Sequence, residues 1–299
     1  MALKTVAVMS PGNMGEGVGE SIAGQGKEVI AVLTGRSDET RMRAERAGFQ
    51  DVPDLEALVR EADLVLSIMP PENAEAFARE VATAMKATGS APVYADLNAI
   101  SPMTSRRIAE MMAEAGADYL DGGIIGGTPL KSDAITRIYV SGPRAGLMLE
   151  LDGNGMEIRN VGDEIGRASA VKMVYASVTK GVDSLLTAAY TTAESLGIRE
   201  ILENEWKESQ AQTLARMERR VPALPADAGR WIGEMEEIAA TYAAAGVTPN
   251  FHKGAADMYR LLNATPFAAE SRETRDMSRT MQQSVEVYVA HLTGRKAAE

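Results

Sequence analysis

One uninterrupted helical pattern, from Gly162 to Gly197, constrains the fold of this chain more than any other stretch. It is rich in Ala, Val, Leu and Met, contains no Pro, and repeats its apolar residues with the period of a helix. About thirty residues at ~1.5 Å each give a helix on the order of 45 Å long, which exceeds one small domain. We therefore expect two domains, residues 1–162 and 163–299, joined by this long helix.

The part of the chain before this helix alternates short apolar runs with helical segments. The runs expected to form strands are Thr5–Met9, Glu28–Leu33, Asp63–Ile68, Pro92–Ala95, Asp118–Asp121, Arg137–Ser141 and Met156–Asn160. Such alternation is typical of a mostly parallel sheet with helices on both faces, the doubly wound α/β or Rossmann architecture, which binds ligands beyond the carboxyl ends of its strands. We expect a glycine-rich loop from Gly122 to Pro129. No strand pattern follows Asp163, so the second domain is predicted to be all-helical.

Charge and composition narrow the function classes. A net charge of −11 on 299 residues argues against nucleic acid and anionic membrane surfaces as partners, and any anionic ligand would need local positive groups. The chain has no Cys and two His residues, too few for a metal centre built from these ligands. The first residues lack the pattern of a secretory signal, and no apolar run reaches membrane-spanning length. We therefore expect a cytoplasmic protein without a metal.

The segment after the first predicted strand has the composition of a nucleotide loop. Ser10 ends the strand, and Gly12, Asn13, Met14 and Gly15 lead into a helix. Gly12 lets the backbone approach a pyrophosphate, and the helix N-terminus supplies N–H groups for an anion. The usual G-x-G-x-x-G fingerprint has a glycine where Ser10 stands, so a purely structural turn is the alternative. The position of the segment, at the first βα turn, favours dinucleotide binding.

The end of the second predicted strand indicates which nucleotide is bound. An acidic residue there would hold the ribose 2′-hydroxyl of NAD, but this chain has Thr34, Arg36 and Ser37, with no acid before Asp38. A guanidinium fork and hydroxyl groups suit a 2′-phosphate. We therefore predict NADP (NADPH) in preference to NAD, with an ordinary surface arginine as the alternative for Arg36.

Six segments, in order, resemble the β-hydroxyacid dehydrogenase superfamily, which includes 6-phosphogluconate dehydrogenase and the imine reductases. They are Gly12–Gly15, Thr34–Ser37, Met69–Pro71, Asp96–Pro102, Asp121–Gly127 and Lys172–Ala176. The resemblance implies a Rossmann domain followed by an all-helical domain on a long helix, an NAD(P) cofactor, and a homodimer or higher homo-oligomer formed through the helical part. It is nearest to a poorly characterised subgroup with such a helical domain.

The resemblance carries cofactor contacts over to two loops that follow predicted strands. Met69, Pro70 and Pro71 match the loop near the nicotinamide ribose. Asn98 lies in the next loop, which borders the nicotinamide and is expected to contact both cofactor and substrate.

The substrate loop of the family corresponds to Ile125, Gly126, Gly127 and Thr128. The family has a Ser at the first of these positions, where it helps to hold a carboxylate, so this chain departs from the pattern. Ala176 also stands where the family usually has Asn. The resemblance therefore leaves the ordinary carboxylate pocket incomplete, although Thr128 can supply a hydroxyl group.

The long helix carries the candidate catalytic residues. Lys172 matches the catalytic lysine of the family. As an ammonium it can donate a proton to a carbonyl oxygen that receives hydride, and as an amine it can act as the base in oxidation. Tyr175, one turn away, is expected to orient substrate or join a proton relay, or else to pack in the hinge. Lys180 is expected to meet an anionic substrate group or to be solvated. His252 is expected to line the substrate cleft or to be structural.

These features predict an NADP-dependent oxidoreductase that interconverts a small hydroxy compound and its aldehyde or ketone, with a lysine as general acid/base. Ile125, together with the likeness of residues 119–129 to imine reductases, favours imine reduction or reductive amination as an alternative. Ser10, Ile125 and Ala176 are also compatible with a protein that senses NADPH without turnover. The ligand is a small molecule under all three hypotheses.

Overall fold

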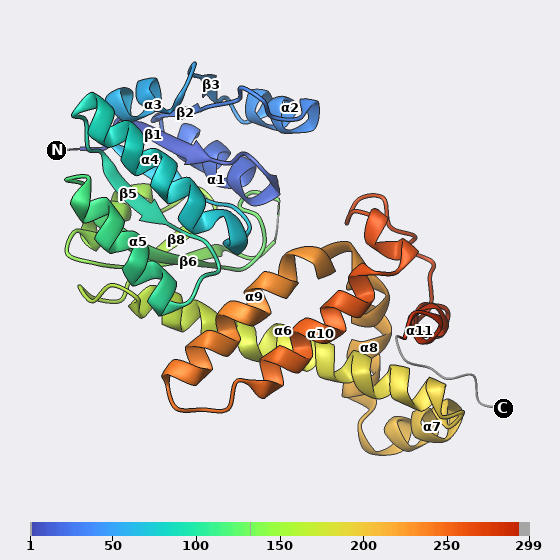
Figure 1. Ribbon diagram of the computed structural model, residues 1–299. Coiled ribbons are helices and arrows are strands. Elements are labelled where there is room, and N and C mark those ends of the chain that lie inside the picture. Colours follow the sequence, from blue (N-terminus) through green and yellow to red (C-terminus); the bar gives the residue numbers. More distant parts are fainter. Residues whose placement is uncertain (1, 132, 293–299) are drawn as a thin grey trace. The chain divides into compact units, whose positions relative to one another are not determined.

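The computed structural model describes residues 2–131 and 133–292 (Figure 1). Their contacts divide the chain into two compact units, Met1–Val174 and Tyr175–Glu299. The division falls inside the long helix α6 (Arg167–Ser195), whereas the sequence suggested a boundary between residues 162 and 163. Each unit has its own buried core.

The described part of the first unit is built on an eight-stranded sheet with the order β3-β2-β1-β4-β5-β6-β7-β8. The strands are β1 (Thr5–Met9), β2 (Glu28–Ala31), β3 (Gln50–Asp51), β4 (Leu64–Ser67), β5 (Val93–Asp96), β6 (Tyr119–Ile125), β7 (Thr136–Ser141) and β8 (Met156–Asn160). Neighbouring strands are parallel except for β6 and β7, which are antiparallel. The predicted Rossmann architecture is confirmed.

Helices cover both faces of this sheet. They are α1 (Asn13–Ala23), α2 (Asp38–Arg46), α3 (Leu55–Glu61), η1 (Pro71–Asn73), α4 (Ala74–Thr88), α5 (Pro102–Glu114) and η2 (Ala145–Leu151). The strand order runs outward in one direction from β1 and in the other from β4, so right-handed crossovers place α1 and α4 on opposite faces. Figure 1 shows α4 and α5 side by side. Because the strand order reverses between β1 and β4, ligands are expected beyond the carboxyl ends of these two strands.

Two details of the first unit differ from the sequence-based expectation. Short elements that no pattern predicted, β3 and α3, lie between β2 and β4. The loop expected from Gly122 begins later, because β6 continues to Ile125 and pairs with β7. A Cβ at Gly122 would lie 2.2 Å from the Leu97 side chain, so this glycine permits close packing within a strand rather than marking a turn.

The second unit contains the C-terminal part of α6 and further helices. These are α7 (Arg199–Ser209), α8 (Ala211–Arg220), η3 (Val221–Ala223), α9 (Pro225–Ala244), α10 (Asn250–Asn263), η4 (Pro266–Ala269) and α11 (Met281–Ala290). Between residues 175 and 292 no strand occurs, which confirms the predicted helical region. Helices α9 and α10 pack together, and the rings of Trp231 and Tyr259 meet edge to face at 5.3 Å. No helix in the described ranges is long and apolar enough to cross a membrane.

Candidate cofactor and substrate site

The turn between β1 and α1 is open at one glycine and tightly packed at another. Gly12 is the N-cap of α1, and a Cβ built on it would meet no atom within 4 Å. A Cβ on Gly15 would lie 2.1 Å from the Ser10 carbonyl oxygen, so this glycine lets the helix pack against the end of the strand. The Ser10 amide donates to the Ile68 carbonyl oxygen at 3.1 Å, which fixes the turn beside the end of β4.

A nucleotide pyrophosphate fits this turn. No side chain caps α1 within the described residues, and the space beside its N-cap is clear. Uncapped N–H groups and the helix dipole favour an anion at such a position. Ser10, Gly12, Asn13, Met14 and Gly15, all predicted to bind cofactor, lie together here.

The predicted 2′-phosphate residues lie at the start of α2. Arg36 is exposed, and Gly35 before it has a φ of 74°, a conformation that favours glycine. Ser37 is the N-cap of α2, and its hydroxyl oxygen accepts a hydrogen bond from the Thr40 amide at 3.3 Å. Thr34 is exposed in the same turn. The turn therefore combines a cation, hydroxyl groups and a helix N-terminus.

Four residues of adjacent strands lie in one row across the sheet. The register aligns Met9 with Ser67, Ser67 with Asp96, and Asp96 with Asp121. Asn98, which is 2% exposed, forms hydrogen bonds with two residues of this row, Ser67 and Asp96.

The Asn98 amide group is fully engaged by its neighbours. Its Oδ1 accepts from the Met69 amide at 2.6 Å, and its Nδ2 donates to Ser67 Oγ at 2.8 Å and Asp96 Oδ2 at 3.0 Å. Asn98 thus holds in place the loop of Met69, Pro70 and Pro71. A direct contact of its side chain with cofactor or substrate stays a prediction.

The predicted substrate loop packs along α1. Thr128 Oγ1 donates to Asn13 Oδ1 at 2.9 Å, which joins a predicted substrate residue to a predicted cofactor residue. A Cβ on Gly17 would lie 2.4 Å from Thr128 Cγ2, so a glycine of α1 makes room for the loop. Gly126 has a φ of 125°, and the Gly127 carbonyl oxygen accepts from Thr136 Oγ1 at 2.6 Å.

A buried carboxylate on α1 also binds this loop. Glu16 is 3% exposed and pairs with Lys131 at 2.7 Å and with Arg46 at 3.0 Å. Burial alone would raise the pKa of Glu16, but the hydrogen bonds from Lys131 and Arg46 outweigh burial and hold that pKa below its ordinary value. This segment is therefore tied to α1 at two positions three residues apart, Asn13 through Thr128 and Glu16 through Lys131.

The start of α6 is held by Asp121 of β6. The residue before the helix is Gly166, which has no side chain to cap it. The Asp121 carboxylate accepts instead from the amides of Gly166 at 3.1 Å and Ser169 at 2.9 Å, and from the hydroxyl groups of Ser105, Ser141 and Ser169. It is 0% exposed. These bonds fix the position and rotation of the first turn of α6.

Lys172 lies one turn further along α6, directly against β6. A Cβ on Gly123 would lie 2.6 Å from Lys172 Cβ, so the lysine stem rests on the glycine. Lys172 is half-buried, and Tyr175 is 47% exposed. Ile125, two residues beyond Gly123, is buried at 3% exposure and offers no hydroxyl group.

Lys180 and His252 belong to the helical unit. Lys180 pairs with the buried Glu234 and lies over the ring of Trp231, 5.1 Å from its centroid. His252 is buried and packs edge to face on Tyr242, with ring centroids 4.5 Å apart, and burial lowers its pKa. Both side chains therefore have structural contacts within this unit, and their predicted contact with substrate stays a prediction.

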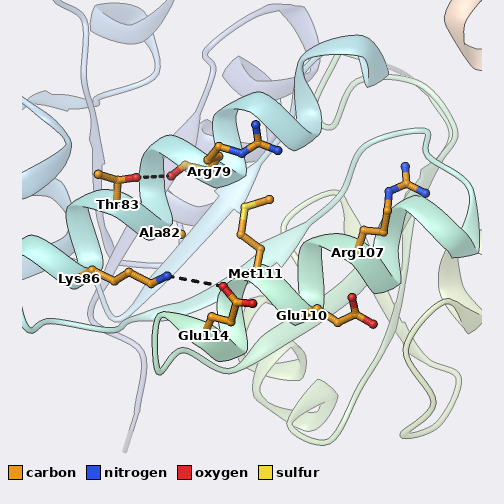
Figure 2. A pocket seen from close by; sticks show the side chains of 8 residues that line it. All are labelled: Arg79, Ala82, Thr83, Lys86, Arg107, Glu110, Met111 and Glu114. Atoms are coloured by element: carbon orange, nitrogen blue, oxygen red, sulfur yellow. Dashed lines mark hydrogen bonds and ion pairs between the residues drawn. The ribbon is translucent and has the colours of Figure 1, made fainter.

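A separate groove lies between α4 and α5 in the first unit. Figure 2 shows it lined by the side chains of Arg79, Ala82, Thr83, Lys86, Arg107, Glu110, Met111 and Glu114. Lys86 pairs with Glu114 at 3.7 Å, and Arg107 pairs with Glu75 at 2.8 Å, so opposite charges largely balance. None of the predicted site residues lines this groove. In the two described ranges, no three His, Cys, Asp or Glu side chains gather in a possible metal site.

Comparison with known proteins agrees with this geometry. Residues 5–148 match the NAD binding domain of 6-phosphogluconate dehydrogenase, and residues 193–262 match a domain of unknown function. These matches support the resemblance to the β-hydroxyacid dehydrogenase superfamily. The expected class, a dehydrogenase or reductase with a nicotinamide cofactor, is thereby confirmed.

Individual relatives are similar over most of the chain. An uncharacterised 28.5 kDa protein of Methanothermus fervidus is 30% identical over 177 residues, which cover 59% of this chain and 66%, just under two thirds, of that protein. A solved structure of a conserved protein of unknown function, described as similar to 3-hydroxyacid dehydrogenases, is 28% identical, with a TM-score of 0.61 over 86% of this chain and 98% of the other. The fold is also that of Mycobacterium tuberculosis 3-hydroxyisobutyrate dehydrogenase, at 19% identity and a TM-score of 0.63, covering 96% and 99% of the two chains.

Three residues of strands β6 and β7 were not predicted from the sequence to have a role in the site: Asp121, Gly123 and Arg137. Asp121 and Gly123 were assigned to a strand end and a loop, and Arg137 to an unremarkable strand. For Arg137 a signal was present, since Arg137 and Tyr139 alternate with Ile138 and Val140 and therefore share one face of the strand. Nothing local marks Asp121, because its donors Gly166 and Ser169 lie 45 and 48 residues away.

Proposed function

We propose that this protein is an NADP-dependent oxidoreductase that interconverts a small hydroxy compound and its aldehyde or ketone. The observation that carries the proposal is the position of Lys172, held against Gly123 of β6 on the sheet whose strand ends form the cofactor turn. When bound, the nicotinamide supplies or accepts hydride. The protein then has to place the carbonyl group and provide a proton.

In this proposal Lys172 is the general acid in reduction and the general base in oxidation. The proposal is supported by the Lys172 stem, which rests on β6, and by Asp121, which fixes the first turn of the helix. A positioned proton donor of this kind contributes typically about 10²–10⁴-fold to rate. Tyr175, exposed one turn along α6, is assigned to substrate orientation or a proton relay.

The preference for NADP is supported by the turn after β2. Arg36 is exposed there beside the capped start of α2, and the turn has no acid before Asp38. We expect Arg36→Ala to weaken NADPH binding by about 1.5–3 kcal/mol and to leave NADH binding nearly unchanged. Arg60→Ala is the matched control, because Arg60 lies on α3 and pairs with Glu56 at the surface. Equal NADPH affinity in the Arg36 variant would refute the preference.

The test of the whole proposal is a fluorescence titration of the purified protein with NADPH and NADH, followed by small aldehydes, ketoacids and imines. Tight NADPH binding with turnover that Lys172→Ala abolishes supports the dehydrogenase proposal. Tight binding without turnover on any of these compounds would instead favour an NADPH sensor. If neither nucleotide bound, the nucleotide turn would not be functional and the proposal would fail.

Imine reduction is the second candidate, and Ile125 favours it. A buried isoleucine at the end of β6 supplies no hydroxyl group for a carboxylate and suits an apolar substrate better. Activity on a mixture of ketone and amine, without activity on ketoacids, would favour this candidate.

We further infer that residues 1–162 form the nucleotide domain and that residues 163–299 provide the contact between subunits of a homodimer or higher homo-oligomer. Helix α6 carries large apolar side chains that are exposed at helical spacing: Val174 (53%), Val178 (61%) and Leu185 (65%). Side chains of this kind on one stripe are typical of a protein interface. Light scattering should give a mass of at least twice the 31.9 kDa chain. A monomer at micromolar concentration would contradict the inference.

A further inference from the structure

Arg137 of β7 lies opposite Ile125, the last residue of β6, on the face of the sheet that α6 covers. The antiparallel register pairs Ile125 with Arg137, Gly123 with Tyr139, and Asp121 with Ser141. Directly opposed residues, and alternate residues along one strand, project to the same face.

Contacts with α6 identify that face. Asp121 binds the start of α6, Ser141 Oγ accepts from the Ala168 amide at 3.1 Å, and Gly123 faces the stem of Lys172. Two residues of a strand span about 7 Å. Along the strands, the backbone of Arg137 therefore lies about 7 Å beyond the pair of Gly123 and Tyr139, where the stem of Lys172 rests.

Within the described residues, no hydrogen bond or ion pair joins Arg137 to the acid opposite it in the sheet. Glu157 of β8 is its register partner, but both carboxylate oxygens of Glu157 are taken by Arg159, at 2.8 and 3.0 Å. Arg159 also donates to Tyr139 Oη at 2.8 Å. The hydrogen bond from Arg159, more than the charge of Arg137, lowers the pKa of Glu157.

Arg137 itself makes no side-chain hydrogen bond or ion pair within the described residues, and its Nε is buried from solvent. A buried donor without an acceptor is uncommon in folded proteins and often marks a ligand position. The planar guanidinium fork matches the geometry of a carboxylate or a phosphate. Because the whole chain carries a net charge of −11, an anionic ligand needs such an unbalanced local cation.

We propose that Arg137 is a specificity-determining residue that binds an anionic group of the substrate, a carboxylate or a phosphate monoester, beside Ile125. This rests on the proposed function, since it assigns Arg137 to the substrate that Lys172 protonates. Arg137 supplies from the neighbouring strand the anion recognition that the apolar side chain of Ile125 cannot supply from the end of β6.

The test is calorimetric titration of the full-length protein with two probes, malonate and inorganic phosphate, at low salt and with or without NADPH. We expect one probe to bind and Arg137→Gln to weaken it at least tenfold, with Arg137→Lys in between because a lysine keeps the charge but loses the fork. The probe that binds distinguishes the carboxylate from the phosphate source. The matched control is Arg144→Gln, since Arg144 is an exposed residue paired with Asp118 at 2.6 Å.

Two further variants separate recognition from loss of structure. Glu157→Gln should tighten anion binding, because it removes the one acid opposite Arg137 in the sheet. Arg159→Gln should weaken anion binding, because it releases Glu157 to pair with Arg137. The inference is overturned if neither probe binds the wild-type protein, if Arg137→Gln binds the probe as well as wild type, or if Glu157→Gln does not tighten binding. NADPH binding is measured separately, so loss of the proposed function is seen independently of this result.

Discussion

Helices α1 and α6 are both preceded by a glycine, yet their N-termini are used in opposite ways. No side chain within the described residues caps α1, and the space beside Gly12 is clear. The start of α6 is satisfied internally, because Asp121 accepts from two of its backbone amides and from three hydroxyl groups. An open N-terminus is suited to an external anion. A closed one fixes a helix in place, here the helix that carries Lys172.

The buried acids of the two units also differ, in the kind of donor that satisfies them. Asp121 is surrounded by neutral donors, whereas Asp183 in the helical unit binds Arg216 at 2.7 Å and Arg220 at 2.9 Å. Removing one member of either network leaves buried groups without partners, which costs more than the lost bonds alone. The network around Asp121 is the one that bears on the proposed chemistry.

The largest effect is expected from Asp121→Ala. The change leaves two amides and three hydroxyl groups in the interior without their acceptor, and we expect a loss of about 3 kcal/mol or more in the free energy of unfolding. Chemical denaturation measures the loss. Asp118→Ala is the control, since Asp118 lies just before β6 but is exposed and pairs only at the surface with Arg144. If both variants lost the same stability, Asp121 would not hold α6 as described.

Gly123→Ala tests whether β6 positions the lysine. The new Cβ would lie 2.6 Å from Lys172 Cβ, so the helix has to move, and overpacking of this kind costs about 1–3 kcal/mol. Turnover should fall while NADPH affinity stays the same, because the cofactor turn is not touched. Gly146→Ala, whose Cβ would meet nothing within 4 Å, should change neither. Unchanged turnover in Gly123→Ala would separate the lysine from β6.

A pair of variants tests the open end of α1. Gly12→Ala adds a Cβ to clear space at φ −74° and ψ −172°, a conformation open to any residue, so stability should stay within about 0.5 kcal/mol. NADPH affinity should fall at least tenfold, or about 1.4 kcal/mol, because the methyl group occupies the path of the pyrophosphate. Gly15→Ala should lower both stability and affinity. Full NADPH affinity in Gly12→Ala would show that the pyrophosphate binds elsewhere.

These residues also explain how far the sequence was informative. The strand–turn–helix around Gly12 and the long helix α6 were predicted, because each depends on residues close together in the chain. Gly122 and Gly123 were misassigned to a loop, because glycine usually indicates a turn. Their place in a strand is explained only by the close packing of Leu97 on Gly122 and of Lys172 on Gly123. Asp121 and Arg137 have partners or neighbours that only the sheet register brings together, so no local pattern identifies their roles.

The smallest effect is expected at a third helix start, that of α2, where the N-terminus is capped and is also expected to bind a phosphate. Ser37 accepts from the Thr40 amide, and its loss in Ser37→Ala should cost about 1 kcal/mol of stability. Asp54→Ala removes an equivalent cap from α3, where Asp54 accepts from the Ala57 amide at 2.8 Å, and should cost about the same. Only Ser37→Ala should also reduce the ratio of NADPH to NADH affinity, by a few-fold, as measured by fluorescence titration. If the two variants left that ratio equally unchanged, Ser37 would serve only as a cap, and the 2′-phosphate would depend on Arg36 and Thr34 instead.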